Sequence, residues 1–455
     1  MRRGRVSVAR HAQSEAMARG GGLIRAGRAP RKGAGFAIPA YIPAQMSIET
    51  LTFGCRLNAF ESEAMRALAT ETGMKAALIV NTCAVTAEAE TQARQAIRRA
   101  AREYPGRPIL VTGCAAQIAP AAWAALPGVT RIIGNADKLR PEAWHAPGAV
   151  SDVMQARDIP ASPVVEMAGR ARAFLQVQQG CDHRCTFCVI PYGRGPSRSV
   201  AMGVVVDQAR AMVAAGTREI VLTGVDIASY GGDLPGQPRL GQLARRLLAL
   251  VPGLPRLRLS SLDPAAIDDD LWRLIAGEPR LMPHLHLSAQ HGADLMLKRM
   301  KRRHLGADLL AITVRARSLR PDIAFGADLI AGFPTETEDD FARMLALVEQ
   351  AGLNFLHVFP YSPRPGTPAA RMPQLPVSLR RERAARLRAA GRAQARRFLE
   401  ARIGCLETVL AERDGRGHTE HFAPVRFLGA APPPGGLHRM RVAAMADDAL
   451  LVEVA

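Results

Sequence analysis

The stretch GCDHRCTFCVIP, residues 180–191, contains three of the chain's seven cysteines, Cys181, Cys185 and Cys188. Three thiolates this close together, on a loop that can wrap a small object, are the soft ligands that iron–sulfur clusters take. A four-iron cluster with three protein ligands keeps one iron open to a substrate or cofactor, which favours catalysis over simple electron transfer. The alternative is a zinc site with His183 as the fourth ligand, although no second ligand pair follows within the next residues.

Around this loop, apolar strand-like runs alternate with segments of helical period. Such segments occur at 203–215, 242–251, 307–319 and 336–351. Six βα units predict an open (βα)6 barrel, short of the eight units that close a full barrel, with its chemistry on the loops that follow the strands. The cysteine loop follows the first of these strands. The six predicted strands are 173–178, 219–223, 256–260, 284–288, 323–330 and 355–359.

A second group of cysteines lies closer to the N-terminus. Strand-like runs at 48–53, 77–80 and 108–111 alternate with helix-like stretches at 59–70 and 87–102, which predicts an open parallel α/β domain. Cys55, Cys83 and Cys114 each come just after one of these runs. Because ligands bind at the carboxyl edge of a parallel sheet, the three thiols are expected to converge there on a second cluster. A lone cysteine after a strand is more often a small buried apolar residue.

The rest of the chain predicts four further segments. Residues 1–45 are basic and lack a sustained apolar period, which indicates either a start at Met46 or an extension resembling a transit peptide. Residues after 398 contain short strand-like runs at 407–411, 422–427, 437–444 and 449–454, which predict a small antiparallel β-barrel. Cys405 is expected to be a plain thiol. The predicted organisation is an extension (1–45), an α/β domain (46–146), a linker (147–172), the barrel core (173–375), a basic connecting helix (376–397) and the terminal barrel (398–455).

The chain is strongly basic, with a formal net charge of +19. The positive charge is concentrated in residues 1–45, in 377–400 and in the cluster at 298–303. Such clusters favour a polyanionic partner, most plausibly nucleic acid, and the alternative is arginine spread over solvated helix faces. No apolar run approaches the roughly 18 residues that span a bilayer, so no membrane partner is predicted. An odd number of cysteines without a disulfide-like array predicts a reducing compartment, and therefore a cytoplasmic protein.

The cysteine loop has the spacing of the radical S-adenosylmethionine enzymes, with Phe187 at the aromatic position before its last cysteine. More narrowly, the chain from Met46 onwards resembles the methylthiotransferases of that superfamily. Its terminal segment resembles the RNA-binding TRAM barrel. The matching motifs are GCRLN (54–58), NTC (81–83), GC (113–114), PYGRG (191–195), LTGVD (222–226), LKRM (297–300) and the segments 285–290, 326–334 and 360–368.

The resemblance implies two [4Fe–4S] clusters, held by Cys181, Cys185 and Cys188 and by Cys55, Cys83 and Cys114, together with S-adenosylmethionine. Within the family, residues 53–63 and 357–363 are most similar to the branch that methylthiolates C2 of N6-threonylcarbamoyladenosine at position 37 of tRNA. The implied partners are the tRNA anticodon loop, a reductase or flavodoxin-type electron donor, and a sulfur source.

Further pocket residues follow less directly from the sequence. Phe187 and Val189 are expected near the adenine of the cofactor, and Asp226, Ser260 and Asp328 are expected at strand ends facing the same mouth. The alternative for the polar residues is a role as a cap or turn residue. Arg194 and Arg198 are expected to meet a cofactor carboxylate or an RNA phosphate, with a solvated loop as the alternative.

Two other classes of function remain open from the sequence. One comprises the sister branches of the family, which act on isopentenyladenosine in tRNA or on an aspartate of a ribosomal protein. The other is a non-catalytic iron–sulfur protein that binds nucleic acid.

Overall fold

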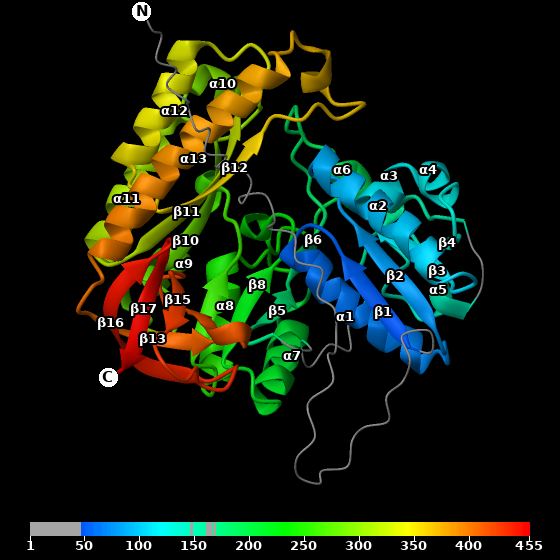
Figure 1. Cartoon of the computed structure of the whole chain (residues 1–455), viewed down its shortest axis with the longest axis horizontal. Helices are drawn as coiled ribbons and strands as arrows, with labels where there is room; N and C mark the ends of the chain where they lie inside the picture. Colours follow the sequence, from blue (N-terminus) through cyan, green and yellow to red (C-terminus); the bar gives the residue numbers. More distant parts are fainter. Residues whose placement is uncertain (1–46, 146–148, 161–166, 168–169) are drawn as a thin grey trace, which may run out of the picture. The chain divides into compact units, whose positions relative to one another are not determined.

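A computed structural model describes residues 47–145, 149–160, 167 and 170–455, so the predicted extension 1–45 lies outside the described residues. The N-terminal α/β unit has a four-stranded, fully parallel sheet in the order β1-β2-β3-β4 (Figure 1). Strand β2 is buried along its whole length because α1 covers one face of the sheet and α2 covers the other. The elements are β1 (Ile48–Thr52), α1 (Arg56–Glu71), β2 (Ala77–Thr82), α2 (Ala87–Glu103), β3 (Ile109–Gly113), α3 (Cys114–Ile118), α4 (Pro120–Ala124), β4 (Val129–Ile132) and α5 (Glu142–His145).

The predicted open (βα)6 barrel is confirmed as two three-stranded parallel sheets, β5-β8-β9 and β10-β11-β12. Two isolated parallel bridges, Leu257 with Leu281 and Leu262 with Leu287, join the sheets between β9 and β10. The strands are β5 (Ala173–Gln176), β8 (Glu219–Thr223), β9 (Arg256–Leu259), β10 (His284–Gln290), β11 (Ala324–Ala331) and β12 (Phe355–Pro360). The main helices are α7 (Met202–Ala214), α8 (Leu240–Leu250), α9 (Asp269–Gly277), α10 (Asp294–Arg299), α11 (Gly306–Leu319) and α12 (Glu338–Gln350).

Helix α1 also covers the first strand of the open barrel. Its residues Phe60, Ala64 and Met65 belong to the same apolar core as Phe174 and Leu175 of β5. An uncovered edge strand would present unpaired backbone groups, so this packing protects β5 and fixes α1 beside the barrel. The helix therefore connects the two sheets through a shared core.

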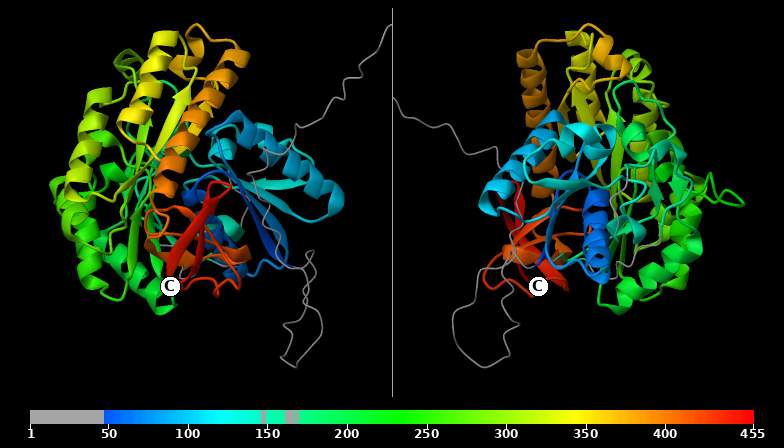
Figure 2. Two further views of the ribbon diagram at one scale, coloured as in Figure 1. Left: turned by 60° about the vertical axis from the view of Figure 1, so that its left-hand side comes forward. Right: turned by 90° about the vertical axis from the view of Figure 1, so that its right-hand side faces the viewer.

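The long helix α13 (Val377–Glu400) lies along α12 and against β12, and leads to a closed five-stranded barrel (Figures 1 and 2). The barrel order is β13-β14-β15-β17-β16, and four of its five strand pairs are antiparallel, as predicted. The fifth pair, β15 with β17, is parallel and closes the barrel. The strands are β13 (Leu406–Ala411), β14 (Arg416–His418), β15 (Pro424–Phe427), β16 (Leu437–Ala446) and β17 (Ala449–Val454).

The prediction missed the short strand β14, ended β16 two residues early and placed one other boundary wrongly. The sequence predicts a strand from 422 onwards, whereas β15 begins at Pro424 and Phe422 lies in the preceding loop with φ +65°. A bulky residue in the left-handed region is unusual, and sequence periodicity gives no sign of it. In the described part of the chain, none of the helices is both long and apolar enough to cross a bilayer.

Candidate functional site: two converging cysteine trios

Cys83 and Cys114 directly follow β2 and β3, and Cys55 comes three residues after the end of β1; the three are called the edge trio. Thr52 pairs with Asn81, and Asn81 pairs with Thr112, so the three strands end at the same level of the sheet. The predicted convergence of the three thiols at this edge therefore agrees with the register. Helix α1 begins immediately after Cys55, three residues earlier than the sequence suggested, so this cysteine is the N-cap of the helix.

Two asparagine side chains hold the strand ends together. The Asn58 amide donates to the Phe53 carbonyl at 2.7 Å and to the Thr82 carbonyl at 3.1 Å, and so links the ends of β1 and β2. The Asn81 amide donates back to the Asn58 carbonyl at 3.0 Å. Both asparagines are buried, and these hydrogen bonds make the trio's scaffold rigid.

Gly54 leaves space beside the thiol of Cys83. A Cβ atom at position 54 would lie 2.5 Å from Cys83 Sγ, and the φ of +97° also disfavours any other residue. The position thus keeps the surroundings of this sulfur open, as a bulky inorganic cluster requires.

Cys181, Cys185 and Cys188, called the loop trio, follow β6 (Gln178–Gln179) and precede α6 (Ile190–Arg194). The Cys181 amide donates to the Gly195 carbonyl at 3.1 Å, and the Cys188 amide donates to the Cys185 carbonyl at 3.1 Å. The loop is therefore closed at both ends by its own backbone. On the barrel side, Arg302 Nη1 approaches Cys185 Sγ at 3.7 Å.

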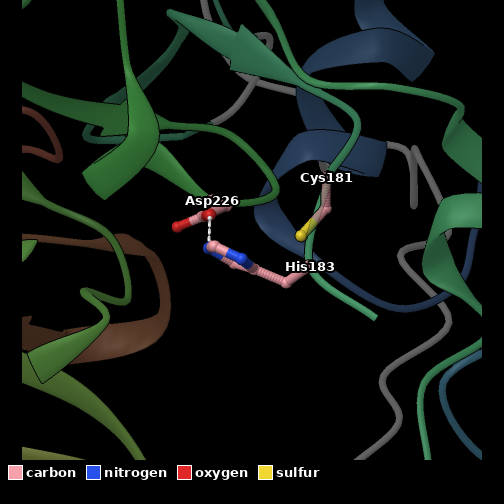
Figure 3. A group of neighbouring side chains, drawn as sticks. All are labelled: Cys181, His183 and Asp226. Carbon is pink, nitrogen blue, oxygen red and sulfur yellow. Dashed lines mark ion pairs between the residues drawn. The ribbon is translucent and has the colours of Figure 1, made fainter. Parts of the chain in front are cut away.

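His183, the alternative zinc ligand, points to Asp226 in the loop after β8 (Figure 3). Its Nε2 lies 3.0 Å from Asp226 Oδ2, and these two atoms and Cys181 Sγ lie within 4.8 Å of one another. Among the described residues, neither Cys185 nor Cys188 belongs to this group. A tetrahedral site of three cysteines and His183 is therefore not formed, which counts against the zinc alternative.

Arg194 was expected to meet a cofactor or RNA, but its guanidinium is buried and bonded to protein groups on both sides of the site. Nε donates to Cys114 Sγ at 3.1 Å, and Nη1 donates to Gln179 Oε1 at 2.9 Å. Nη2 donates to Glu61 Oε2 at 2.9 Å and also to Asn58 Oδ1. The expectation for Arg194 is wrong because these acceptors occupy its donors.

Arg198 is likewise buried and donates to the Arg194 carbonyl at 2.7 Å, so the solvated-loop alternative fails for both arginines. Glu61 also accepts from Lys138 Nζ at 2.6 Å, and both side chains of this pair are fully buried. The sequence patterns did not predict a role for Glu61 or Lys138. Glu61 was detectable as the residue one turn after Asn58 on the same face of α1, whereas Lys138 lies in a loop with no such signal.

The two trios lie next to each other through the contact of α3 with α6. A Cβ on Gly193 would lie 3.1 Å from the Cβ of Cys114, closer than most such contacts, so glycine favours this approach. Val189, expected near the adenine, is buried in the same apolar cluster as Cys114 and Ala115. Its side chain therefore contributes to packing between the two units, and its proximity to adenine stays a prediction.

The chemistry of the thiols fits iron–sulfur groups. Burial raises the pKa of Cys83 to about 12, with the neighbouring Cys114 and Cys55 adding to the effect. Burial also raises the pKa of Cys181 to about 12, reinforced by Asp226, and that of Cys188 to about 12. Thiolates at these positions need a bound cation, because metal coordination deprotonates a thiol outright. Cysteine sulfur at both trios is the donor type that iron prefers in such clusters.

Phe187 and Ser260, two more of the predicted pocket residues, lie in different environments. Phe187 packs against the apolar cluster that contains Met296, Met300 and Phe333. Ser260 is buried directly after β9, where its amide donates to Leu222 at 3.0 Å. Their contact with a cofactor stays a prediction.

Asp328 lies within β11 rather than at its end, and one oxygen, Oδ1, accepts from two histidines. His286 Nε2 lies at 3.0 Å and His357 Nδ1 at 3.1 Å. Burial alone would raise the pKa of Asp328, but these two histidines outweigh it and hold the pKa well below its usual range. Asp328 is therefore an ionised group inside the barrel. The prediction that it lies at a strand end is wrong, because β11 continues for three more residues, to Ala331.

Some of the basic residues expected to contact nucleic acid are used internally. Arg302 is paired with Asp263 at 3.2 Å, and Arg383 of α13 is buried against Glu336 at 2.7 Å. Others on α13, including Arg397, remain exposed. The basic surface is thus smaller than the sequence suggests.

Two family models match different parts of the chain. Residues 175–348 match the model of the radical SAM superfamily, and residues 47–134 match a family described as uncharacterized protein family UPF0004. The open barrel with three cysteines after its first strand is the architecture of radical SAM enzymes. A solved radical SAM methyltransferase, TsrM from Kitasatospora setae, shares the fold with a TM-score of 0.53 at 14% identity, covering 72% of this chain and 77% of that one.

Sequence relatives show which family within the radical SAM superfamily the chain resembles. Threonylcarbamoyladenosine tRNA methylthiotransferase MtaB of Rickettsia prowazekii (strain Madrid E) is 49% identical over 382 residues, covering 83% of this chain and 91% of the relative. MtaB of Bacillus subtilis (strain 168) is 33% identical, covering 86% and 92%. A tRNA-2-methylthio-N(6)-dimethylallyladenosine synthase of Erythrobacter litoralis (strain HTCC2594) is also 33% identical, covering 87% and 91%. The chain belongs to the radical SAM methylthiotransferase family.

Proposed function

We propose that this enzyme attaches a methylthio group to C2 of N6-threonylcarbamoyladenosine at position 37 of tRNA, using two [4Fe–4S] clusters and S-adenosylmethionine. The observation that carries the proposal is the adjacency of two cysteine trios, joined by the α3–α6 contact and by Arg194. The choice of base is supported by the relatives, since the 49% identical one is named for threonylcarbamoyladenosine and the dimethylallyladenosine synthase is 33% identical.

Each trio has a distinct role in this proposal. When bound, the cofactors supply radical hydrogen abstraction at the loop trio and sulfur at the edge trio. Cys181, Cys185 and Cys188 hold the first cluster, and Cys55, Cys83 and Cys114 hold the second. Arg194 fixes the spacing between them, because it donates to Cys114 on one side and to Gln179 on the other.

The partners follow from this chemistry. The substrate is the tRNA anticodon loop, where an unpaired base can be read on its edges. A reductase or flavodoxin-type protein supplies electrons, and a separate sulfur source replenishes the transferred atom, in the reducing cytoplasm. If basic side chains contact phosphates, the affinity for tRNA falls steeply as salt is raised.

Mass spectrometry of tRNA nucleosides tests the proposal directly. Cells lacking the gene should lose the methylthio form of threonylcarbamoyladenosine, and the intact gene should restore it. A gene encoding Cys405→Ala, outside both trios, should restore it equally well. Persistence of the nucleoside in the deletion strain, or loss of the isopentenyl form instead, would contradict the assignment.

A further inference from the structure

Arg56, the first residue of α1, is the residue next to Cys55 of the edge trio. Its guanidinium carbon lies 5.5 Å from the centroid of the Phe422 ring in the C-terminal barrel. Within residues 47–145, 149–160, 167 and 170–455, the guanidinium has neither a hydrogen bond nor an ion pair. Arg56 is only partly buried, so its N–H groups are available to a ligand that enters beside the edge trio.

Phe422 forms a rigid platform under this guanidinium. Its ring stacks on His418 at 4.6 Å and on His284 of β10 at 5.3 Å between centroids. Its left-handed backbone, with φ +65°, is a conformation that a bulky residue adopts only where the surroundings impose it. A cation held over an aromatic face keeps its position while its N–H donors remain free at the edges.

The neighbouring arginines already have partners. Arg172 lies 2.8 Å from Glu219 and 2.6 Å from Glu412, and Arg258 lies 3.1 Å from Glu219. Both guanidiniums also face Phe422, at 5.2 and 5.0 Å from its centroid. In the described part of the chain, Arg56 is thus the arginine of this group that has no ion pair.

Asp328, the other acid near Arg56, is also satisfied. Its Oδ1 accepts from His286 and His357, and its Oδ2 lies 3.4 Å from the Ser261 hydroxyl. Among the described residues, Arg56 therefore has no direct ion pair at the junction of the N-terminal sheet, the open barrel and the C-terminal barrel, and only the more distant negative charges of Glu219 and Asp328 act on it.

We propose that Arg56 binds the carboxylate of the threonylcarbamoyl group and so selects the modified base. This inference rests on the proposed function, and it makes Arg56 a specificity-determining residue. A guanidinium is the donor best matched to a carboxylate, because its planar fork can form two parallel hydrogen bonds. Cys55 binds the sulfur-donating cluster, so an anchor at the adjoining residue holds the substituent of the base beside the atom that receives sulfur.

An RNA phosphate presents the same kind of anionic oxygen, so the test must separate the two. The holoenzyme is titrated anaerobically with three anticodon stem–loop RNAs of one sequence. The first carries threonylcarbamoyladenosine at position 37, the second carries its methyl ester, and the third carries unmodified adenosine. The wild-type enzyme is expected to bind the free acid roughly tenfold or more tightly than the ester, because one charge-assisted pair is lost.

Arg56→Ala and Arg56→Gln should both reduce this acid-over-ester preference to near unity, and Arg56→Lys should retain part of it. Arg66→Ala is the matched control, since Arg66 is an exposed residue of the same helix paired with Glu63. Affinities are compared at equal iron content, so that damage to the neighbouring cluster is accounted for. The ester comparison uses the unaltered enzyme and stays informative even where a variant misfolds.

Three results would overturn the inference. Equal binding of acid and ester by the wild-type enzyme excludes recognition of the carboxylate. An equal loss of affinity for all three RNAs in Arg56→Ala assigns the residue to a phosphate instead. An unchanged preference in Arg56→Ala assigns the carboxylate to another group. The proposed function fails separately, if the wild-type holoenzyme does not methylthiolate the free-acid RNA.

Discussion

The loop trio occupies eight residues of one loop, whereas the edge trio is gathered from three strand ends between residues 55 and 114. The amides of Cys181 and Cys188 donate to the carbonyls of Gly195 and Cys185, both close in the sequence, although Arg302 also approaches Cys185 from a distant segment. The edge trio instead depends on side chains from distant segments, including Asn58 and Arg194. A site built locally tolerates changes elsewhere in the fold, while a site built by convergence is sensitive to each element that brings its parts together.

The largest expected effect comes from the loop trio. Cys185→Ala removes a ligand of the cluster that binds S-adenosylmethionine, so both cofactor cleavage and tRNA modification should fall below detection. Anaerobic incubation with reductant, followed by chromatography of 5′-deoxyadenosine and mass spectrometry of nucleosides, measures the two together. Cleavage at the wild-type rate in this variant would remove the loop trio from the radical step.

The edge trio should separate the two activities. Cys83→Ala removes a ligand of the second cluster, so 5′-deoxyadenosine should still form while methylthiolation is abolished. Cys405→Ala, in the C-terminal barrel, is the matched control and should affect neither. Retained thiolation in Cys83→Ala would refute the assignment of the edge trio as the source of inserted sulfur.

The same contrast explains what could be predicted from the sequence. The loop trio was visible from spacing alone, and the edge trio from its place after three strand-like runs. The order of the two α/β units follows from local periodicity, and the barrel was recognisable from its six repeats. Arg194 was misjudged because its partner Glu61 lies 133 residues away, and no local pattern encodes that pair.

Phe422 in the C-terminal barrel shows a second limit of prediction from sequence. Phe422 begins a largely apolar run, so sequence-based reasoning places it in a strand. Its actual loop conformation depends on contacts with His284 and three arginines from other elements. Tertiary contacts therefore override the local preference at Phe422. The contact of Arg56 with the Phe422 ring depends on the same tertiary arrangement, so no local sequence pattern predicts it.

Replacing Arg194, which donates to Cys114 and to Gln179, should have a smaller effect, and this effect is on stability. Arg194→Ala leaves Glu61 and Lys138 buried without the third member of their network, and removes the donor to Cys114. Loss of one partner from a buried ionic group costs about 3–5 kcal/mol, so the free energy of unfolding should fall by an amount of that order. Denaturant unfolding followed by fluorescence measures this change.

Arg273→Ala provides the control for this loss, because Arg273 is exposed and, among the described residues, pairs only with Asp270 on the surface of α9. Its effect should stay below about 0.5 kcal/mol. Equal destabilisation by the two substitutions would show that Arg194 does not hold the units together. Arg194→Ala should also reduce thiolation more than cofactor cleavage, since Cys114 belongs to the edge trio.

The smallest effect concerns His421, which links the C-terminal barrel to the open barrel. Its Nδ1 lies 3.1 Å from Glu407, and its Nε2 lies 2.9 Å from Asp322. Burial alone would lower the pKa of His421, but hydrogen bonds to these two acids outweigh it and raise the pKa. The stabilisation is therefore complete below the unfolded pKa of about 6.5, and is lost as pH rises through the higher folded pKa.

Hydrogen exchange of the β13 amides, corrected for intrinsic rates, should accordingly show weaker protection at pH 8.5 than at pH 6. His421→Gln should flatten this dependence without abolishing it. Burial and Glu407 also raise the pKa of Glu420, whose ionisation acts in the same direction. Protection that increases with pH in the wild-type chain would contradict the charged bridge. Because the bridge joins only two surfaces, its loss should loosen the C-terminal barrel while leaving 5′-deoxyadenosine formation at the loop trio intact.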